Sequence, residues 1–330
     1  MKKILNDLYQ HKKLSKSEAK KILLEIADSR YNEAHLASFM TVFMMRPITA
    51  DELSGFREAL LELAIKIDLS EYNTIDIVGT GGDGKDTFNI STLTSFVVAG
   101  TGQKVAKHGN YSVSSKSGSS DMLESFGYEF TNDVTILKSH LEKANICFLH
   151  APKFHPAMAA VGPTRKALAL KTFFNMLGPL VNPSSHQNLM LGTFNLEIAR
   201  LYHYILQDEN SNYGIIHALD GYDEISLTSG FKFFTKFGEE LLHPEDIGQK
   251  RILQKDIYGG DSVTSAAKIF KTIIEGKGTE EQTNVVLTNA AFALKIVDKN
   301  KTFEEAFSLA KDSLFGGKAS QCLEQLISNC

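Results

Sequence analysis

Cysteine is scarce in this sequence, and its placement excludes a disulfide framework and a cysteine metal site. Cys147, Cys322 and Cys330 are odd in number and far apart, and no two of them form a Cys-x-x-Cys pair. We interpret them as reduced thiols. Long apolar runs are also missing, because no stretch is long enough to span a bilayer and the N-terminus lacks the apolar segment of a signal peptide. These absences predict a cytoplasmic protein without a membrane partner.

An excess of positive charge is missing as well. The chain has 35 Lys and Arg against 39 Asp and Glu, which gives a formal net charge of −4. We therefore expect no nucleic-acid partner, and any attraction for phosphates must come from local loops. No internal repeat, low-complexity tract or flexible linker interrupts the sequence. A length of 330 residues, 43% of them apolar, fits one large α/β domain plus a smaller one.

The first part of the chain, to about residue 70, has the pattern of helices. Two capping boxes precede apolar residues at helical spacing. They are Ser15 with Glu18 and Thr49 with Glu52. Between them, residues 36–45 (Leu-Ala-Ser-Phe-Met-Thr-Val-Phe-Met-Met) are too apolar for a helix that covers only one face of a core. Such a helix is either wholly internal or in contact with a second subunit, and we favour the subunit contact.

Further along the chain, the pattern changes to alternating strands and helices. Short apolar runs predict strands at 74–78, 103–106, 146–149 and 213–219, and two that look antiparallel at 224–227 and 231–237. Helical spacing predicts helices at 91–100, 120–126, 134–145 and 162–183, and from about 265 onward. This alternation predicts a mainly parallel central sheet with ligand loops at the carboxyl ends of its strands.

Three loops rich in glycine and hydroxyl side chains lie where these strands end or helices begin. They are 79–83 (Gly-Thr-Gly-Gly-Asp), 89–92 (Asn-Ile-Ser-Thr) and 107–119 (Lys-His-Gly-Asn-Tyr-Ser-Val-Ser-Ser-Lys-Ser-Gly-Ser). Backbone amides that glycines and helix N-termini leave exposed bind anionic oxygens. Three such loops in succession predict a ligand with several phosphate groups.

Taken alone, each loop has a simpler interpretation. A glycine turn is often only a tight connection, and this one is neither a Walker loop nor a dinucleotide fingerprint. Ser91 or Thr92 can simply cap the helix that follows. The third loop can be a solvated polar loop, and His108 within it is more often a structural histidine, so we assign it no acid–base role.

Two further features point to anionic and metal ligands. Arg165 lies near the expected start of a helix, where positive charge is unfavourable. That position suggests an anionic partner, because guanidinium pairs with carboxylate in bidentate fashion, whereas a surface salt bridge is the alternative. Asp223 and Glu224 follow a predicted strand and suit Mg²⁺ when phosphate oxygens and waters complete the octahedron. On its own, their segment reads as a turn.

Together these motifs resemble the anthranilate phosphoribosyltransferase family over essentially the whole chain. The resemblance rests on the three loops, on 172–179 (Thr-Phe-Phe-Asn-Met-Leu-Gly-Pro), on Asp223-Glu224 and on 289–291 (Asn-Ala-Ala). It implies Mg²⁺-dependent transfer of the 5-phosphoribosyl group from phosphoribosyl pyrophosphate to the amine of anthranilate, in tryptophan biosynthesis.

The resemblance also implies an α/β fold with nucleoside-phosphorylase-like phosphoribosyltransferase architecture, assembled as a homodimer. A helical N-terminal domain would cover 1–70 and also receive the segment 162–185. An α/β domain over 71–330 would bind phosphoribosyl pyrophosphate.

Roles for individual residues follow from the same resemblance. Two Mg²⁺ ions would be held by Ser91, Asp223 and Glu224, and anthranilate would contact Gly79, Asn110 and Arg165. Phosphoribosyl pyrophosphate would be bound by Gly79, Gly82, Asp83, Thr87, Asn89, Ile90, Ser91, Thr92, Lys107, His108, Gly109, Asn110, Tyr111, Ser112, Val113, Ser114, Ser115 and Ser119. No general acid or base is assigned, because an aromatic amine already has a usable lone pair and the reaction mainly needs positioning and charge neutralisation.

Two positions depart from the family pattern. Tyr111 stands where members commonly have arginine, and Lys171 replaces the arginine usual before Thr-x-Phe-Asn. The first change removes a guanidinium, whereas the second keeps the charge without the bidentate geometry.

Two other classes of protein fit the sequence less well. Pyrimidine nucleoside phosphorylases resemble this fold, but their third loop carries Lys-x-Ser-Gly-Arg and His-Thr-Gly-Gly-Thr segments instead. A non-catalytic relative that binds nucleic acid through a basic surface conflicts with the net negative charge and with Asp223-Glu224.

Overall fold

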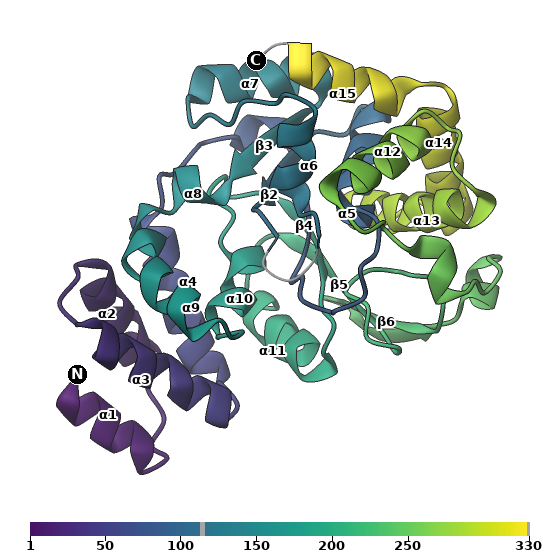
Figure 1. The fold of residues 1–330 in the computed structure, drawn as a ribbon. Coiled ribbons are helices and arrows are strands. Elements are labelled where there is room, and N and C mark those ends of the chain that lie inside the picture. The colour runs from purple at the N-terminus through teal and green to yellow at the C-terminus, as the bar shows by residue number, and fades with distance from the viewer. Residues whose placement is uncertain (113–115, 329–330) are drawn as a thin grey trace. The chain divides into compact units, whose positions relative to one another are not determined.

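The computed structural model describes residues 1–112 and 116–328 and divides the chain into two compact units. The helical unit consists of Met1–Ile67 with Ala151–Pro183, and the α/β unit of Asp68–His150 with Ser184–Cys330. Figure 1 shows the course of the chain by residue number. The helical unit thus receives the chain from Ala151, earlier than the expected segment 162–185.

The N-terminal part of the helical unit is built from four helices, and side-chain caps start three of them. Its helices are α1 (Lys2–Tyr9), α2 (Lys16–Ala27), α3 (Glu33–Met45) and α4 (Ala50–Leu63). Both predicted capping boxes are confirmed, at Ser15 before α2 and at Thr49 before α4. In each, the hydroxyl accepts the amide hydrogen of a glutamate three residues on, and that carboxylate accepts the amide of the cap.

The apolar helix α3 is not wholly internal. Phe39 and Phe43 form edge-to-face contacts with Phe56 and Phe173 inside the helical unit. At the C-terminal end of α3, however, Met45 is 84% exposed. The interpretation of this helix as wholly internal is therefore wrong.

The returning segment of the helical unit consists of short pieces. They are α8 (Ala151–Phe154), the 3₁₀ turns η2 (Pro156–Ala160) and η3 (Gly178–Leu180), α9 (Gly162–Leu168) and α10 (Phe174–Leu177). The single helix predicted over 162–183 is wrong, because Ala169 adopts a left-handed conformation (φ 51°) that ends α9. The side chain of Asn175 then accepts the Thr172 amide hydrogen at 3.0 Å and starts the next turn.

The α/β unit contains a seven-stranded sheet in the order β3-β2-β1-β4-β5-β6-β7 (Figure 1). The strands are β1 (Ile75–Gly79), β2 (Val105–Gly109), β3 (Ile146–His150), β4 (Asn188–Gly192), β5 (Asn212–Ala218), β6 (Phe231–Thr235) and β7 (Gly238–Leu242). Pairs from β3 to β5 are parallel, and the pairs of β6 are antiparallel. The mainly parallel sheet is thus confirmed. Since β1 lies between β2 and β4, the strand order reverses beside β1, which is where such sheets bind ligands.

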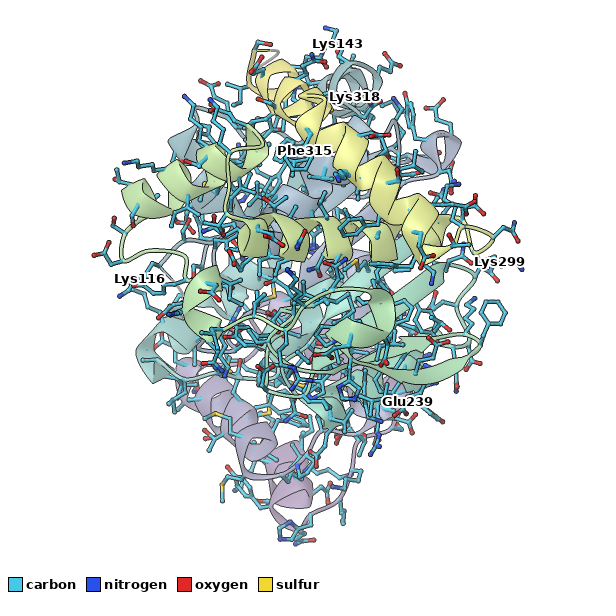
Figure 2. The ribbon with its side chains drawn as sticks, turned by 90° about the vertical axis from the view of Figure 1, so that its right-hand side faces the viewer. Lys116, Lys143, Glu239, Lys299, Phe315 and Lys318 are labelled. Carbon is cyan, nitrogen blue, oxygen red and sulfur yellow. The ribbon has the colours of Figure 1, made fainter. Side chains whose placement is uncertain are left out.

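Helices pack on this sheet and bury its core. They are α5 (Ile90–Gly100), α6 (Ser119–Ser125), α7 (Val134–Ala144), α11 (Leu196–Leu206), α12 (Val263–Ile274), α13 (Glu280–Val297), α14 (Phe303–Phe315) and α15 (Lys318–Ser328), with 3₁₀ turns η1 (Ser70–Tyr72), η4 (Pro244–Ile247) and η5 (Gln254–Ile257). Helix α5 is buried along nearly its whole length and packs against α13, α14 and α15. In Figure 2, Phe315 and Lys318 mark the turn between the last two helices. Within 1–112 and 116–328, no helix meets the length and apolarity needed to cross a membrane.

The strand predicted at 224–227 is wrong. This segment has no ladder partner, and the side chain of Asn289 instead pairs with both main-chain groups of Ile225. Strands β4 and β7, helix α11 and the one-turn helix α8 went unpredicted, as did the 3₁₀ turns η4 and η5. Strand β7 (Gly-Glu-Glu-Leu-Leu) lies at the edge of the sheet and is largely exposed. Its sequence therefore shows neither the alternation of apolar and polar residues nor the β-branched residues that indicate a strand.

Candidate active site

Two glycines on paired strands leave space for Asp223. Gly79 ends β1 and is the register partner of Gly192, which ends β4. A Cβ on Gly79 would overlap the Asp223 carboxylate, and a Cβ on Gly192 would overlap the Asp223 carbonyl oxygen. Asp223 is only 7% exposed, and its Oδ2 accepts the amide hydrogen of Gly81 at 2.7 Å. The first loop and the acidic segment are therefore joined directly.

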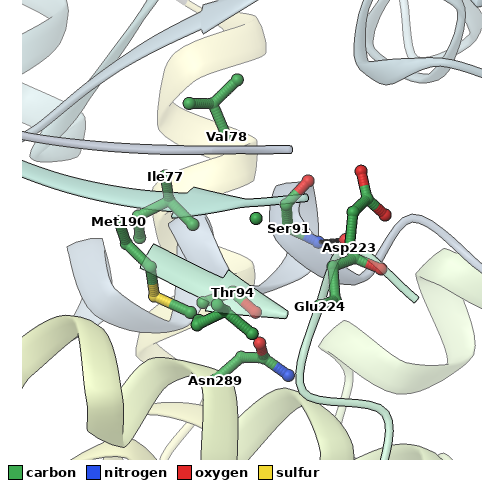
Figure 3. A pocket seen from close by; sticks show the side chains of 10 residues that line it. Ile77, Val78, Ser91, Thr94, Met190, Asp223, Glu224 and Asn289 are labelled. Carbon is green, nitrogen blue, oxygen red and sulfur yellow. Dashed lines mark hydrogen bonds between the residues drawn. The ribbon is translucent and has the colours of Figure 1, made fainter. Parts of the chain in front are cut away.

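Glu224 joins the acidic segment to the second loop. Its Oε1 accepts the amide hydrogen of Ser91 at 2.9 Å, at the N-terminal turn of α5. The carboxylate thus occupies an anion position at a helix N-terminus. In Figure 3, Ser91, Asp223 and Glu224 lie together on one side of a small pocket, away from Met190 and Ile77.

The carboxyl groups of this pocket repel one another. Burial raises the pKa of Asp223 above its ordinary value, and the charge of Asp83 raises it further. Burial also raises the pKa of Glu224, as do the charges of Asp223 and Asp83, while Lys107 acts in the opposite direction. A folded protein that keeps buried like charges together has a site suited to a cation.

The donor set fits magnesium only in part. Among the residues that the structure describes, no three His, Cys, Asp or Glu side chains form a group able to hold a metal ion. Mg²⁺ commonly takes one or two carboxylates from the protein and completes its octahedron with waters and substrate phosphates. Asp223 and Glu224, with the Ser91 hydroxyl beside them, match such an incomplete donor set.

Lys107 points into the sheet. It is 2% exposed, and its Nζ donates to the carbonyl oxygen of Ile77 at 2.6 Å. Burial lowers its pKa to about 8, against the opposing effect of Asp76 and Glu224. The neighbouring His108 is buried too, and its amide donates to Asp76 at 3.1 Å. In this structure the Lys107 ammonium is therefore buried against β1, where its charge acts on Glu224.

The second and third loops are also joined. Nδ2 of Asn89 donates to the carbonyl oxygen of Ser117 at 3.0 Å. Asp121 ties the middle of the third loop to its C-terminal end, because its Oδ2 accepts the amide hydrogens of Ser112 and Gly118, both at 2.8 Å. All three loops and the acidic segment therefore lie at one edge of the sheet.

Ser119 and Gly109 of the third loop are both in close contact with neighbouring groups. Ser119 Oγ donates to the carbonyl of Asn110 at 3.4 Å, and Gly109 leaves no room for a Cβ beside Ser119 and Phe148. Three predicted site residues, Val113, Ser114 and Ser115, lie outside the described residues.

Tyr111, which replaces the usual arginine, packs as an aromatic ring. Its centroid lies 5.0 Å from that of His150 in an edge-to-face contact, and His150 stacks on Phe130 at 4.1 Å. The Tyr111 hydroxyl donates to Glu124 at 3.3 Å. Burial, followed by the charge of Glu124, raises the pKa of the Tyr111 hydroxyl, so the phenol stays neutral. The positive charge of an arginine is absent at this position.

The second loop is braced by a distant segment. Thr87 forms an antiparallel bridge with Tyr258, and the Gly259 amide donates to the Asp86 carbonyl at 2.8 Å. The Phe88 amide donates to the Ile257 carbonyl at 3.2 Å. After this brace, Ile90 and Thr92 are each 1% exposed, and the Ile90 amide donates to the Phe88 carbonyl at 2.6 Å.

Arg165 belongs to the helical unit, in α9. Its guanidinium carbon lies 5.4 Å from the centroid of the Phe174 ring, a cation–π contact. In the described part of the chain no carboxylate forms an ion pair with it. The contact that the structure shows for this guanidinium is thus an aromatic ring of the same unit.

Several residues of this site were not singled out from the sequence. Gly192 and Gly259 act through contacts with segments far along the chain, whereas Asp121 binds the nearby Ser112 and Gly118. Asn289 was named only within the motif 289–291, with no role assigned to it. Gly192 could have been noticed in the sequence, because a glycine at the end of an apolar run such as β4 often marks a close approach of another segment. Asp121 could also have been noticed, since an acidic residue in the first turn of a helix caps exposed amides.

The chain belongs to the glycosyl transferase family. The model of its a/b domain matches residues 71–320, and the model of its helical bundle domain matches residues 2–64. Among curated relatives, the anthranilate phosphoribosyltransferase of Flavobacterium johnsoniae is 59% identical over 326 residues, which cover 99% of this chain and 98% of the relative. That of Bacteroides fragilis is 50% identical over 327 residues, which cover 99% of both chains.

Solved structures of the same kind of enzyme also resemble this chain. The anthranilate phosphoribosyltransferase of Thermus thermophilus superposes with a TM-score of 0.91 at 29% identity and covers 98% of both chains. The Saccharomyces cerevisiae enzyme in complex with PRPP and Mg gives a TM-score of 0.88 at 27% identity, covering 96% of this chain and 93% of that one. Within the glycosyl transferases, this chain is thus a member of the anthranilate phosphoribosyltransferase family, an enzyme of tryptophan biosynthesis. Both the nucleoside phosphorylase and the non-catalytic alternative are thereby excluded.

Proposed function

We propose that this enzyme transfers the 5-phosphoribosyl group from phosphoribosyl pyrophosphate to the amine of anthranilate, in a Mg²⁺-dependent reaction that releases pyrophosphate. One observation carries the proposal: Asp223 and Glu224 are hydrogen-bonded to the amides of two glycine- and hydroxyl-rich loops, at Gly81 and Ser91. The carboxylates that we assign to the metal thus lie beside the loops that we assign to the phosphates. Related yeast structures in complex with PRPP and Mg and with 4-fluoroanthranilate support the same substrates.

The residues divide by the part of the substrates that they contact. We assign anthranilate to Gly79, Asn110 and Arg165, and two Mg²⁺ ions to Ser91, Asp223 and Glu224. Phosphoribosyl pyrophosphate is assigned to residues of the three loops, namely Gly79, Gly82, Asp83, Thr87, Asn89–Thr92, Lys107–Ser115 and Ser119. A metal ion bound there would neutralise the negative charge that grows on the departing pyrophosphate.

The protein's own contribution is mostly positioning and electrostatics. The amine lone pair attacks the anomeric carbon as the bond from that carbon to pyrophosphate breaks, with inversion. The nitrogen carries a positive charge after the attack and loses one proton to solvent or to the pyrophosphate, which gives N-(5-phosphoribosyl)anthranilate. Loop amides stabilise phosphate oxygens, and no side chain is needed as a strong base.

Anthranilate fluorescence provides a direct test. Enzyme, Mg²⁺ and phosphoribosyl pyrophosphate together should remove the fluorescence, and omission of any one of them should preserve it. Persistent fluorescence at every metal concentration tested would overturn the proposed function.

Arg165 is expected to bind the carboxylate of anthranilate. Arg165→Ala should raise the KM for anthranilate about 10- to 100-fold, because a charge-assisted bidentate pair is lost. The KM for phosphoribosyl pyrophosphate should stay within about twofold. Steady-state kinetics on both substrates checks this, with exposed Arg30→Ala as the control. An unchanged anthranilate KM would remove Arg165 from the site.

Gly259 is expected to affect the binding of phosphoribosyl pyrophosphate by fixing the position of the second loop. A Cβ at this position would overlap the main chain of Thr87 and Phe88, so Gly259→Ala should displace the loop and raise the KM for phosphoribosyl pyrophosphate about tenfold. Gly248→Ala is the control: its φ of +68° predicts a stability loss of about 1 kcal/mol with unchanged KM. Equal KM values in the two variants would show that the brace does not position the loop.

Assembly and location complete the proposal. We infer a homodimer formed through the N-terminal helices, because α3 ends in exposed Met44 and Met45. The reduced thiols and the composition of the chain support a cytoplasmic location. Sedimentation of the purified enzyme, compared with a Met45→Glu variant, tests the dimer.

A further inference from the structure

The segment that carries the acidic pair has little support from the sheet. After β5 ends at Ala218, the chain turns, and the Ala218 amide donates to the Tyr222 carbonyl at 3.2 Å. Beyond this turn, residues 223–227 belong to no strand. Something other than a β-ladder must therefore fix the main chain that follows Glu224.

Asn289 provides the missing partner. Its Oδ1 accepts the amide hydrogen of Ile225 at 3.1 Å, and its Nδ2 donates to the carbonyl of the same residue at 2.8 Å. The amide side chain thus makes the two hydrogen bonds that an adjacent strand would make. Nδ2 also donates to the Val285 carbonyl at 2.8 Å, which fixes the side chain against its own helix, α13.

The position of Asn289 is unfavourable unless these bonds matter. It lies inside an 18-residue helix, where asparagine is a poor helix former, and it is 1% exposed among apolar neighbours. Asn289 also lines the same pocket as Asp223 and Glu224 (Figure 3). An apolar residue would serve the packing of α13 better, so the contact with Ile225 accounts for the amide.

We propose that Asn289 is a positioning residue that holds the Asp223–Glu224 segment in its metal-binding arrangement. This inference rests on the proposed function, because it assumes that those carboxylates bind the divalent cation. Asn289 itself touches neither substrate nor metal in this assignment. Its loss would free Ile225 and, through it, the adjoining Glu224.

A matched pair of variants on one helix tests the proposal. Asn289→Leu removes all three hydrogen bonds and keeps the branching of the side chain at Cγ. Thr288→Val is the control, since Thr288 is equally buried and its hydroxyl makes no hydrogen bond to the described residues. Mn²⁺ binding to the enzyme alone, followed by loss of the free-ion electron paramagnetic resonance signal, should weaken about 10- to 100-fold in Asn289→Leu and less than twofold in Thr288→Val.

Kinetics supplies the second measurement. The Mg²⁺ concentration for half-maximal rate should rise by a similar factor in Asn289→Leu, with the anthranilate KM within about twofold. A purely structural role would lower the melting temperature with unchanged Mn²⁺ and Mg²⁺ dependence, and that result would overturn the inference. If Asn289→Leu does not fold, Asn289→Ala is measured instead, because it cannot overpack the pocket. Absence of Mn²⁺ binding and turnover in the unmodified enzyme would refute the proposed function itself, whereas equal behaviour of the two variants refutes only the role of Asn289.

Discussion

Replacing Asp223 by asparagine and Glu224 by glutamine should reduce turnover about 1,000-fold or more while making the metal-free protein more stable. The loss of turnover follows because several kcal/mol of charge stabilisation by a bound metal ion disappear with its carboxylates. The gain in stability follows because burial and mutual repulsion raise the pKa of both carboxyl groups. Neutral amides of the same shape remove that repulsion, and we expect a gain of about 1–3 kcal/mol in the free energy of unfolding.

The sign of the pH dependence is specific. A carboxyl whose pKa is raised on folding costs stability above its folded pKa, and the cost fades as the pH falls toward its unfolded pKa. Denaturant unfolding in EDTA should therefore show a larger gain for the double variant at pH 8 than at pH 5. The exposed Asp208→Asn serves as the control, with unchanged turnover and stability. A double variant that is less stable at both pH values, or that keeps its Mg²⁺-dependent rate, would contradict the assignment.

Gly192→Ala should lower kcat at least 100-fold. A methyl group there would overlap the carbonyl oxygen of Asp223, main chain against main chain, so the acidic segment has to move as a whole. A shift of about 1 Å at a site that works by positioning costs roughly 100-fold in rate. Rate measurements are made on protein shown to be folded by circular dichroism.

The control for Gly192 is another glycine with a different constraint. Gly102 has a φ of +96° and open space around its Cα, so Gly102→Ala should cost about 1–2 kcal/mol of stability with unchanged kcat. Loss of stability and loss of rate are thereby separated. If Gly192→Ala keeps more than a tenth of the rate, the close approach of β4 to Asp223 is not needed for catalysis.

Local chemistry explains what the sequence alone could predict. Ser15 and Thr49 begin helices because each forms both halves of its capping box within four residues. The glycine-rich loop after β1 and Asp223 after β5 were predicted at the same edge of the sheet, because parallel strands end together. In these cases, every interaction that decides the structure lies within a few residues or follows from the direction of the strands.

Longer contacts explain what could not be predicted. Residues 224–227 look like a strand by composition, yet their partner is Asn289, which is 64 residues from Ile225. The sequence placed Lys107 in an anion-binding loop but could not show that its ammonium turns inward to Ile77. Likewise, the ring contacts of Tyr111 depend on His150 and Phe130, whose positions follow only from the folded sheet.

The paired glycines that end β1 and β4 have a consequence for how this sequence can evolve. Gly79 faces the carboxylate of Asp223 and Gly192 faces its carbonyl, so the three positions share one volume. A side chain cannot enter at either strand unless the acidic segment retreats, and the segment cannot retreat without giving up its bond to Gly81. Single mutations at these positions should therefore be strongly epistatic. Across descendants of this gene, the two glycines and the aspartate should persist or change together, whereas neighbouring strand positions drift one at a time.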